Sequence, residues 1–436
     1  MHSGKESSCY VERAARVFPG GTINALQLPP GERFVVARAQ GARVWDEAGR
    51  EYIDLLMGSG PLILGHAHPA VVEAVRAQAE LGTTYYQVSK PAVQLAEEIL
   101  AAFPGAERLR FVSDGSDATY MAVRLARAAT GRRRVLKFEG GFHGSHDLSM
   151  ISMSPQEERE FPRGVPASAG VPESAVEEVL VAPFNDLETT ARIARAWRDE
   201  LAAIIVEPVQ RDIVPEPDFL PGLRRLADEI GCLLIFDEVV TGFRFCYGGV
   251  QELFGVRADL TCLGKIIGGG LPLAAVVGPA AIMDLCAPGP GRLPVYLSGT
   301  LFGNPLAAAA GLATLAQLRQ EGVYQRLEEL GARLRRGIAD VMTAAGVEAT
   351  VTGMGSMFHF HFAAGPICSY RDILRGDRAA LRDVHLGWLR RGVYVNPGAK
   401  GYLSLAHDER DVDLALDALS AAVAEVAPRL KVSAAG

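Results

Sequence analysis

Residues 231 to 244 read Gly231-Cys-Leu-Leu-Ile-Phe-Asp-Glu-Val-Val-Thr-Gly-Phe-Arg244, and this stretch decides the fold. Its apolar run is short and uninterrupted, which is typical of a strand buried on both faces of a parallel sheet. The run ends abruptly on Asp237 and Glu238. Because open α/β sheets hold their ligands at the carboxyl ends of the strands, two carboxylates in this place predict a site there.

A second stretch, Asp259-Leu-Thr-Cys-Leu-Gly-Lys-Ile-Ile-Gly-Gly-Gly-Leu-Pro272, places Lys265 between an apolar strand and a glycine turn. A lysine with apolar neighbours loses solvation and its pKa falls, which makes its amine a usable nucleophile. Since most lysines at a strand end only extend their ammonium into water, this position alone decides little. Together with Asp237 it suggests an amine that forms a Schiff base and a carboxylate that pairs with a cationic ring nitrogen.

The composition is typical of a globular enzyme. The 436 residues are 49% hydrophobic and 22% charged, and the net charge is −7 with acids and bases interspersed. This balance favours neither nucleic-acid nor membrane binding. The six cysteines show no CxxC motif and no metal-like spacing with histidine, and the first ten residues have no apolar core. We therefore expect a cytoplasmic protein with reduced thiols, no signal peptide and no metal site.

Residues 266–283 form an uncharged run that is long enough for a membrane helix. The run contains Gly268, Gly269, Gly270, Pro272 and Pro279. Because these residues interrupt helices, we expect a buried strand and a turn instead.

The alternation of elements predicts an α/β fold. From residue 70 to 310, apolar strands (109–112, 134–138, 203–206 and 233–236) alternate with amphipathic helices such as 118–129 and 220–230. This order predicts a large domain with a mostly parallel seven-stranded sheet between helices. Residues 311–436 predict a smaller α+β domain, and the N-terminal segment 1–69, with a hairpin over 43–54, is expected to pack with it and at a dimer interface. The polar, proline-containing stretch 149–174 predicts a lid loop.

Polar residues follow several of the predicted strands. The segment Ser113–Thr119 opens a helix, and there Gly115 permits close approach while Ser116 adds a hydroxyl, which is the chemistry of an anion site. A plain helix N-cap is the alternative. Phe142 and His143 follow the next strand, where a flat aromatic ring can stack on a planar ligand, although a core phenylalanine and a turn histidine are the simpler interpretations.

Two further strand ends add to this order. Glu207 ends the strand 203–206, and Thr300, within Ser298–Pro305, offers a hydroxyl before a helix of small residues. Each piece is weak alone, but their order along the chain is specific.

The chain resembles a class III, fold-type-I pyridoxal-5′-phosphate (PLP) enzyme, and within that family it is most similar to the glutamate-1-semialdehyde 2,1-aminomutases. The similarity runs from about residue 10 to 425 and includes five motifs in the family's order: Leu62–Pro69, Lys137–Gly140, Phe236–Arg244, Cys262–Gly270 and Ser298–Thr300.

The resemblance implies roles for the site residues. Lys265 would form the internal aldimine and move the proton between substrate and cofactor, and Asp237 would pair with the pyridinium nitrogen. Thr300 would reach the phosphate of the neighbouring subunit, which implies a homodimer with shared active sites. The other implied cofactor contacts are Gly115 and Ser116 at the phosphate, Phe142 and Val239 on the two ring faces, and His143, Glu207 and Asp212 around the ring.

Departures from the family's pattern concern the substrate. Phe142 stands where the family usually has a tyrosine, Gln27 where it has an arginine for the substrate carboxylate, and Ser59 where it has a tryptophan. The segment Val395-Asn-Pro-Gly-Ala-Lys-Gly-Tyr402 has no acid where the family has a substrate-facing glutamate. These losses argue against glutamate-1-semialdehyde as substrate.

Three cations are candidates for substrate contacts. Arg211 stands where the family has a small residue, and with Lys400 it offers a relocated carboxylate site; a surface ion pair with Asp212 is the alternative. Lys137, in its family motif, is also a candidate.

Asp114 replaces a small serine beside the phosphate turn, where a carboxylate repels phosphate unless it turns towards other donors.

These features predict a PLP-dependent aminotransferase that moves an amino group from an amino-acid donor to a keto or aldehyde acceptor by a ping-pong mechanism, with an acceptor of specialised metabolism. An aminomutase that moves the amine within one molecule is the first alternative. A racemase or epimerase on the same scaffold is the second, and a non-catalytic cofactor-sensing module is a third.

Overall fold

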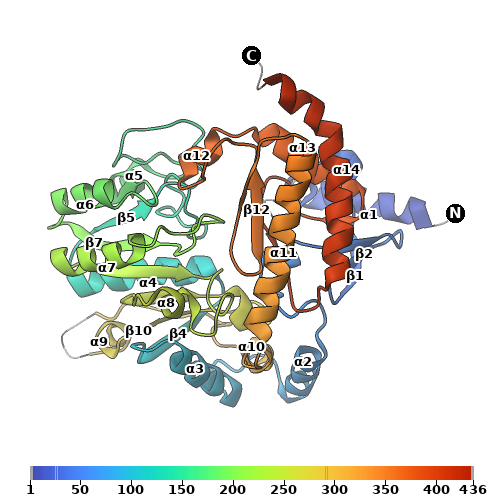
Figure 1. Cartoon of the computed structure of the whole chain (residues 1–436). Coiled ribbons are helices and arrows are strands. Elements are labelled where there is room, and N and C mark those ends of the chain that lie inside the picture. The colour runs from blue at the N-terminus through green and yellow to red at the C-terminus, as the bar shows by residue number, and fades with distance from the viewer. Residues whose placement is uncertain (1–2, 25, 27, 290, 292, 434–436) are drawn as a thin grey trace. The chain divides into compact units, whose positions relative to one another are not determined.

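The computed structural model describes residues 3–433 except 25, 27, 290 and 292 (Figure 1). The chain divides into two compact units. The central unit comprises Pro69–Tyr324 and Ile367–Leu374, and the terminal unit comprises Met1–His68, Gln325–Pro366 and Arg375–Gly436. Each unit is described by itself.

A seven-stranded sheet forms the centre of the central unit, in the order β4-β10-β9-β8-β7-β5-β6. Adjacent strands are parallel except β10, which runs antiparallel to both β4 and β9. The predicted α/β fold with a mostly parallel sheet is confirmed. The bounds are β4 Arg108–Val112, β5 Arg134–Phe138, β6 Val179–Ala182, β7 Leu201–Val206, β8 Leu233–Glu238, β9 Leu260–Leu263 and β10 Ala274–Gly278.

The strands form where apolar residues run without interruption, since every residue of β6, β7, β9 and β10 is buried. Residues 266–283 accordingly contain a 3₁₀ turn, η4 (Lys265–Gly268), and the strand β10. Among the described residues, none of the helices combines the length and apolarity needed to cross a membrane.

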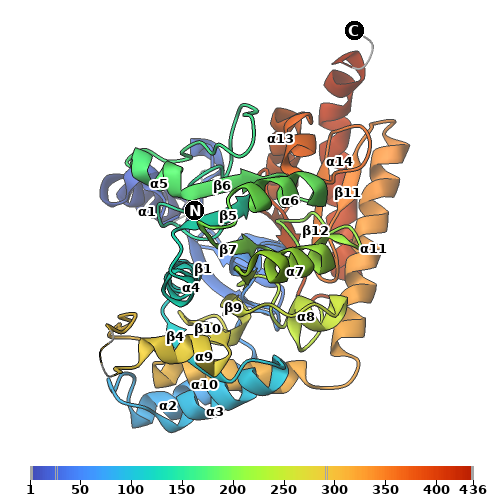
Figure 2. The same cartoon turned by 90° about the vertical axis from the view of Figure 1, so that its left-hand side faces the viewer.

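Helices cover both faces of this sheet (Figure 2). Helix α4 (Gly115–Thr130) lies on one face, and α7 (Phe219–Ile230) and α8 (Gly249–Phe254) lie on the other. Helices α2 (Pro69–Leu81), α3 (Lys90–Ala102) and α10 (Pro305–Leu318) pack together. The remaining helices are α5 Glu173–Glu178, α6 Leu187–Ala196, α9 Ala280–Met283, η5 Asp284–Cys286 and α12 Tyr370–Leu374.

The terminal unit holds two small sheets. One has the order β1-β2-β3-β13 and contains the predicted hairpin, because β2 and β3 pair antiparallel; the other has the order β11-β12-β14. Its core includes Ile338, Phe358, Phe360, Trp388 and Leu419. The bounds are η1 Pro19–Gly21, η2 Pro30–Glu32, β1 Val36–Gln40, β2 Arg43–Asp46, β3 Glu51–Asp54, η3 Met57–Ser59, β11 Thr350–Thr352, β12 Met357–His361, β13 Val393–Tyr394 and β14 Gly401–Tyr402, with helices α1 Ser3–Val17, α11 Val323–Ala344, α13 Arg378–Arg390 and α14 Glu409–Ser433.

The two units part at residues 324 and 325, whereas the sequence pattern places a boundary at 310. Residue 310 lies inside α10, whose small buried residues allow close packing on α2 and α3. Residues 311–324 therefore stay with the central unit. A second difference is the segment Ile367–Leu374, which follows the strands β11 and β12 in the chain but packs with the central unit.

Candidate active site

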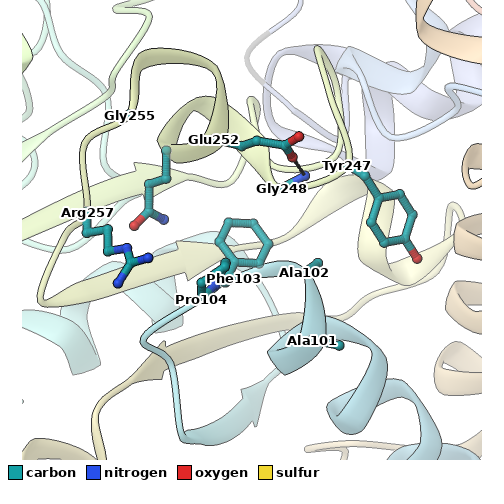
Figure 3. Close-up of a pocket in the computed structure, with 10 residues that line it drawn as sticks. Ala101, Ala102, Phe103, Pro104, Tyr247, Gly248, Glu252, Gly255 and Arg257 are labelled. Carbon is teal, nitrogen blue, oxygen red and sulfur yellow. Dashed lines mark hydrogen bonds between the residues drawn. The ribbon is translucent and has the colours of Figure 1, made fainter.

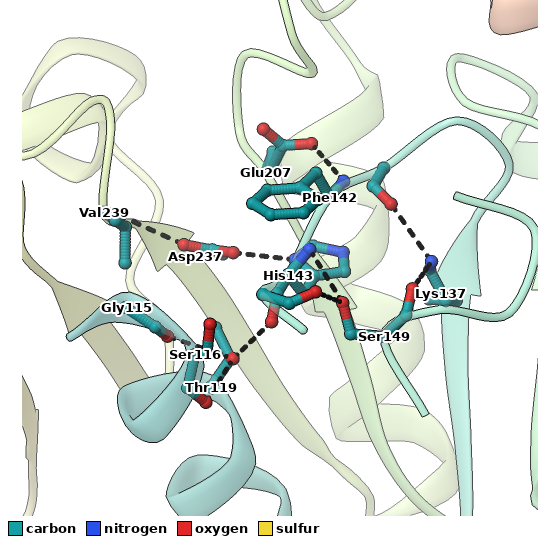
Figure 4. Close-up of polar contacts among 12 residues, drawn as sticks. Gly115, Ser116, Thr119, Lys137, Phe142, His143, Ser149, Glu207, Asp237 and Val239 are labelled. Carbon is teal, nitrogen blue, oxygen red and sulfur yellow. Dashed lines mark hydrogen bonds and ion pairs between the residues drawn. The ribbon is translucent and has the colours of Figure 1, made fainter. Parts of the chain in front are cut away.

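The predicted site lies at the carboxyl ends of β5, β7 and β8, where the loop after β5 meets Asp237 (Figure 4). Asp237 is 5% exposed. Its Oδ1 accepts from the backbone N–H of Val239 at 3.1 Å, and its Oδ2 lies 2.8 Å from His143 Nδ1. Burial lowers the pKa of His143, with Lys137 adding to this effect and Glu207 opposing it. A neutral His143 therefore donates its Nδ1–H to the Asp237 carboxylate.

Side chains fix the backbone of the segment Glu139–Phe142, which leads from β5 to His143. Gln210 Nε2 donates to Glu139 O at 2.8 Å, and Arg211 Nε donates to Gly140 O at 3.0 Å. Lys137 Nζ donates to Gly141 O at 3.0 Å, and Glu207 Oε2 accepts from Phe142 N at 2.8 Å. Four consecutive residues are thus held by four different side chains, which leaves the Phe142 ring 38% exposed on a rigid support.

Lys137 itself does not offer its amine to a ligand. Nζ also donates to Ser149 O at 2.8 Å and Ile151 O at 2.6 Å, so the protonated form of Lys137 has a carbonyl acceptor for each of its three N–H groups. The pKa of Lys137 is lowered to about 7, mainly by burial and also by Arg211, while Glu207 opposes both effects. These contacts make Lys137 a support of the loop, and they do not favour the predicted substrate contact.

The start of α4 lies beside the same loop. A Cβ on Gly144 would stand 2.5 Å from Ser116 Cα, and Ser116 Oγ accepts from Ser145 N at 3.1 Å. Asp114 turns its carboxylate into its own helix, where Oδ1 accepts from Asp117 N at 3.0 Å. The sequence required that a carboxylate beside the phosphate turn be directed towards other donors. Asp114 meets this requirement, because its carboxylate accepts from a backbone N–H of its own helix.

Val239 connects the start of α4 with the lysine turn. A Cβ on Gly115 would stand 2.8 Å from Val239 Cγ1, and a Cβ on Gly264 would stand 3.1 Å from the same atom. Gly264 precedes Lys265, which begins η4 with a φ of +48°. A non-glycine residue in this left-handed region is strained, and such strain is common at functional sites.

Apart from Gln27, the remaining predicted residues belong either to the central or to the terminal unit. Thr300 is exposed in the central unit and lines a cavity of about 480 Å³ with Tyr86, Phe111 and Ser298. Asp212 is buried beside Arg211, which has a φ of +60°. Ser59 and Lys400 belong to the terminal unit. Gln27 lies outside the described residues.

The second carboxylate of the strand end, Glu238, has a structural environment. It is fully buried and accepts from Val250 N at 2.7 Å, Thr241 Oγ1 at 3.0 Å and Gln251 Nε2 at 3.2 Å, and burial raises its pKa to about 7. Gln251 also borders a separate cavity of about 480 Å³ (Figure 3). That cavity contains none of the predicted site residues; among its lining residues are Phe103, Tyr247, Glu252 and Arg257.

Three polar residues of the cluster were not predicted. Thr119 Oγ1 donates to His143 O, Ser149 Oγ lies 3.2 Å from His143 N, and Gln210 supports Glu139. Thr119 stands in the Ser113–Thr119 segment, where its place one turn into the helix was the available signal. Ser149 and Gln210 have no such signal, since only the folded chain brings them to this loop.

Comparison with known proteins gives consistent results. A family model described as aminotransferase class-III matches residues 28–397. Glutamate-1-semialdehyde 2,1-aminomutase from Desulfitobacterium hafniense is 44% identical over 413 residues, which cover 93% of this chain and 95% of that protein. An omega-transaminase from Sphaerobacter thermophilus has a TM-score of 0.91 with 37% identity, over 97% of this chain and 98% of that one. A transaminase with PLP bound has a TM-score of 0.89 with 30% identity, over 99% of this chain and 100% of that one.

The donor set of the central unit fits PLP. The buried Asp237 carboxylate, held by His143, suits the ring nitrogen. The partly exposed Phe142 ring and Val239, which lies between two glycines, suit the two ring faces. The N-terminus of α4, with its serine hydroxyl, suits the phosphate. Because the family model covers most of the chain and relatives of high identity share its length, the chain belongs to the class-III aminotransferase family, whose cofactor is pyridoxal phosphate.

Proposed function

We propose that this protein is an aminotransferase that moves an amino group from an amino-acid donor to a keto or aldehyde acceptor. One observation carries the choice within the family: the segment Val395–Tyr402 contains no carboxylate, and its charged residue is Lys400. An aminomutase that holds the amine of its substrate with a glutamate here cannot do so with this chain. The likeness to the omega-transaminase supports the same choice.

The central unit would bind the cofactor through residues from several strand ends. Gly115 and Ser116 would hold the phosphate at the start of α4, while Phe142 and Val239 would cover the two ring faces. Asp237, oriented by His143, would keep a proton on the ring nitrogen. When bound, PLP supplies an aldehyde that condenses with amines and a cationic ring that accepts electron density.

Lys265 would hold the cofactor between turnovers and then carry a proton to and from the substrate carbon. Its place after β9 and the glycines around it leave the amine on a short, strained turn. Glu207 would act through Phe142, whose backbone N–H it accepts, and so would fix the stacking ring. Thr300 would complete the phosphate site of a partner subunit in a homodimer.

A half-reaction screen tests the proposed activity. The purified holoenzyme is mixed with single amino donors, and the expected result is pyridoxamine phosphate together with the matching keto acid from at least one donor. If no donor yields the pyridoxamine form while one donor is racemised, the racemase alternative replaces this proposal.

Lys265→Ala tests the assignment of the lysine. After borohydride reduction we expect covalently attached cofactor in the wild type and in Lys90→Ala, an exposed lysine at the start of α3, but not in Lys265→Ala. Covalent attachment in Lys265→Ala would show that another amine reacts.

An aminomutase is the second candidate, because a relative at 44% identity is named glutamate-1-semialdehyde 2,1-aminomutase. Incubation with glutamate-1-semialdehyde distinguishes the two functions. Conversion to the isomer with the amine on the neighbouring carbon, at a rate above that of any transfer to an external acceptor, would establish the aminomutase instead.

A further inference from the structure

Two polar atoms beside the predicted site are buried and have no hydrogen-bond partner among the described residues: His143 Nε2 and Gln210 Oε1. The two residues are 2% and 1% exposed. Leaving a buried polar atom without a partner destabilises the folded state, so two such atoms in one place call for a physical explanation.

The two atoms lie close to the same point. A Cβ built on Gly141 would stand 3.2 Å from His143 Nε2 and 3.2 Å from Gln210 Oε1. A third polar atom, Phe138 O, lies 3.1 Å from that point. Gly141 is not among the glycines with positive φ, so its backbone does not require glycine. A methyl group on Gly141 would crowd all three polar atoms, because each of these contacts is shorter than an ordinary van der Waals contact.

Both atoms accept hydrogen bonds. Gln210 Nε2 donates to Glu139 O at 2.8 Å, which settles the orientation of the amide and leaves Oε1 as a carbonyl acceptor. His143 donates from Nδ1 to the Asp237 carboxylate, so the lone pair of the neutral ring is on Nε2. Two acceptors repel each other, and only a donor between them can satisfy both.

We propose that one water molecule lies beside Gly141 and donates to His143 Nε2 and to Gln210 Oε1, which makes Gln210 a positioning residue for Asp237. Water is the smallest donor that can serve two acceptors at once, and it commonly satisfies buried polar groups. This chain of hydrogen bonds, Gln210–water–His143–Asp237, keeps His143 in its Nδ1–H tautomer and keeps the Asp237 carboxylate oriented. Only the last link, from Asp237 to the cofactor's ring nitrogen, rests on the proposed function.

The charged groups around His143 are consistent with this arrangement. Asp237 faces it from β8, Lys137 from β5, and Glu207 and Arg211 from the segment after β7. The Asp237 carboxylate accepts a hydrogen bond from Nδ1–H, and the cations Lys137 and Arg211 disfavour a second proton on the ring. Nε2 is therefore left to accept from a neutral donor.

The ¹⁵N resonances of the His143 imidazole test this chain of hydrogen bonds directly. In the holoenzyme labelled with ¹⁵N-histidine, we expect Nδ1 to carry a proton and Nε2 to be a hydrogen-bonded acceptor. Gln210→Met removes the second acceptor, and Gly141→Ala places a methyl group where the water would lie. Both variants should move the Nε2 resonance downfield while Nδ1 stays protonated. Both should weaken cofactor binding by about two- to tenfold, the effect of one net hydrogen bond.

Gln94→Met, an exposed glutamine of α3, is the matched control and should leave the His143 resonances unchanged. A proton on Nε2 in the wild type, or an Nε2 resonance that neither variant moves, overturns the proposal. Because the resonances do not depend on donor turnover, this failure is distinct from a failure of the aminotransferase assignment. If Gln210→Met does not fold, as judged by circular dichroism, Gly141→Ala and the wild-type protonation state still decide the question.

Discussion

Lys137 shows how far a residue's environment can depart from its motif. Its place in the family motif predicts a substrate contact, but its ammonium is buried and donates to the carbonyls of Gly141, Ser149 and Ile151. The lysine thereby ties both ends of the loop that carries Phe142 to strand β5. Lys137 therefore contributes to function by holding this loop in place.

Lys137 also gives the stability of the protein a pH dependence. Because burial lowers the pKa of Lys137 from 10.5 to about 7, the unfolded chain binds more protons than the folded chain between pH 7 and 10. Wild-type stability should therefore rise over this window, by about 1.4 kcal/mol for each step of one in pH. Urea unfolding of wild type and Lys137→Met across pH 7–10 measures this, and the variant should lack the rise. Equal slopes in the two proteins contradict the assignment.

Among the elements, α12 belongs to the central unit and contacts the loop 152–166 of the same unit. Arg371 of α12 pairs with the buried Glu139, with Nε 2.9 Å from Oε2, and also contacts Glu158 at 3.2 Å. Its guanidinium lies 4.2 Å from the centroid of the Phe161 ring. The stretch predicted as a lid is therefore held by a short helix from a distant part of the sequence.

Removal of this cation should loosen the loop. Arg371→Ala leaves the Glu139 carboxylate buried without its ion pair, so the free energy of unfolding should fall by about 3 kcal/mol. Hydrogen exchange of residues 155–163 should become faster. Adding Glu139→Gln should recover most of the stability, since the unpaired charge is then gone. Arg159→Ala, in an exposed pair with Glu157, is the control and should change stability by about 0.5 kcal/mol or less. A loss of equal size in Arg159→Ala would argue against a specific role of Arg371.

For the whole molecule, exposed apolar side chains in the central unit support the proposed homodimer. Leu81, Tyr86, Val88 and Tyr296 are each more than 70% exposed, and Tyr86 lines the same cavity as Thr300. Apolar surface of this kind is typical of a surface that another chain covers.

Val88→Glu should therefore separate the subunits. Sedimentation should give twice the mass of one chain for the wild type and for Leu253→Glu, an exposed leucine of α8, but the mass of one chain for Val88→Glu. Cofactor binding should weaken in the separated chains by about tenfold or more, because Thr300 would no longer reach a partner's phosphate site. A dimeric Val88→Glu variant with unchanged cofactor affinity would place the interface elsewhere.

Much of the fold follows from local patterns. The buried strands are uninterrupted apolar runs, and their abrupt ends on Asp237 and Glu207 locate the carboxyl edge of the sheet. The hairpin over 43–54 and the long helices of the terminal unit were likewise predictable from turn residues and periodicity. The place of residues 311–324 was not, because it depends on the packing of α10 against helices more than two hundred residues earlier.

The sequence by itself determined the family, the cofactor and the order of the residues at the sheet edge, since these depend on motifs whose spacing is local. Only the tertiary structure decided how those residues are supported. It turned Asp114 into a helix cap, surrounded Lys137 with carbonyls and brought Gln210 beside His143. The physical reason is that hydrogen-bond partners of buried polar groups come from distant segments, and packing rather than periodicity chooses them.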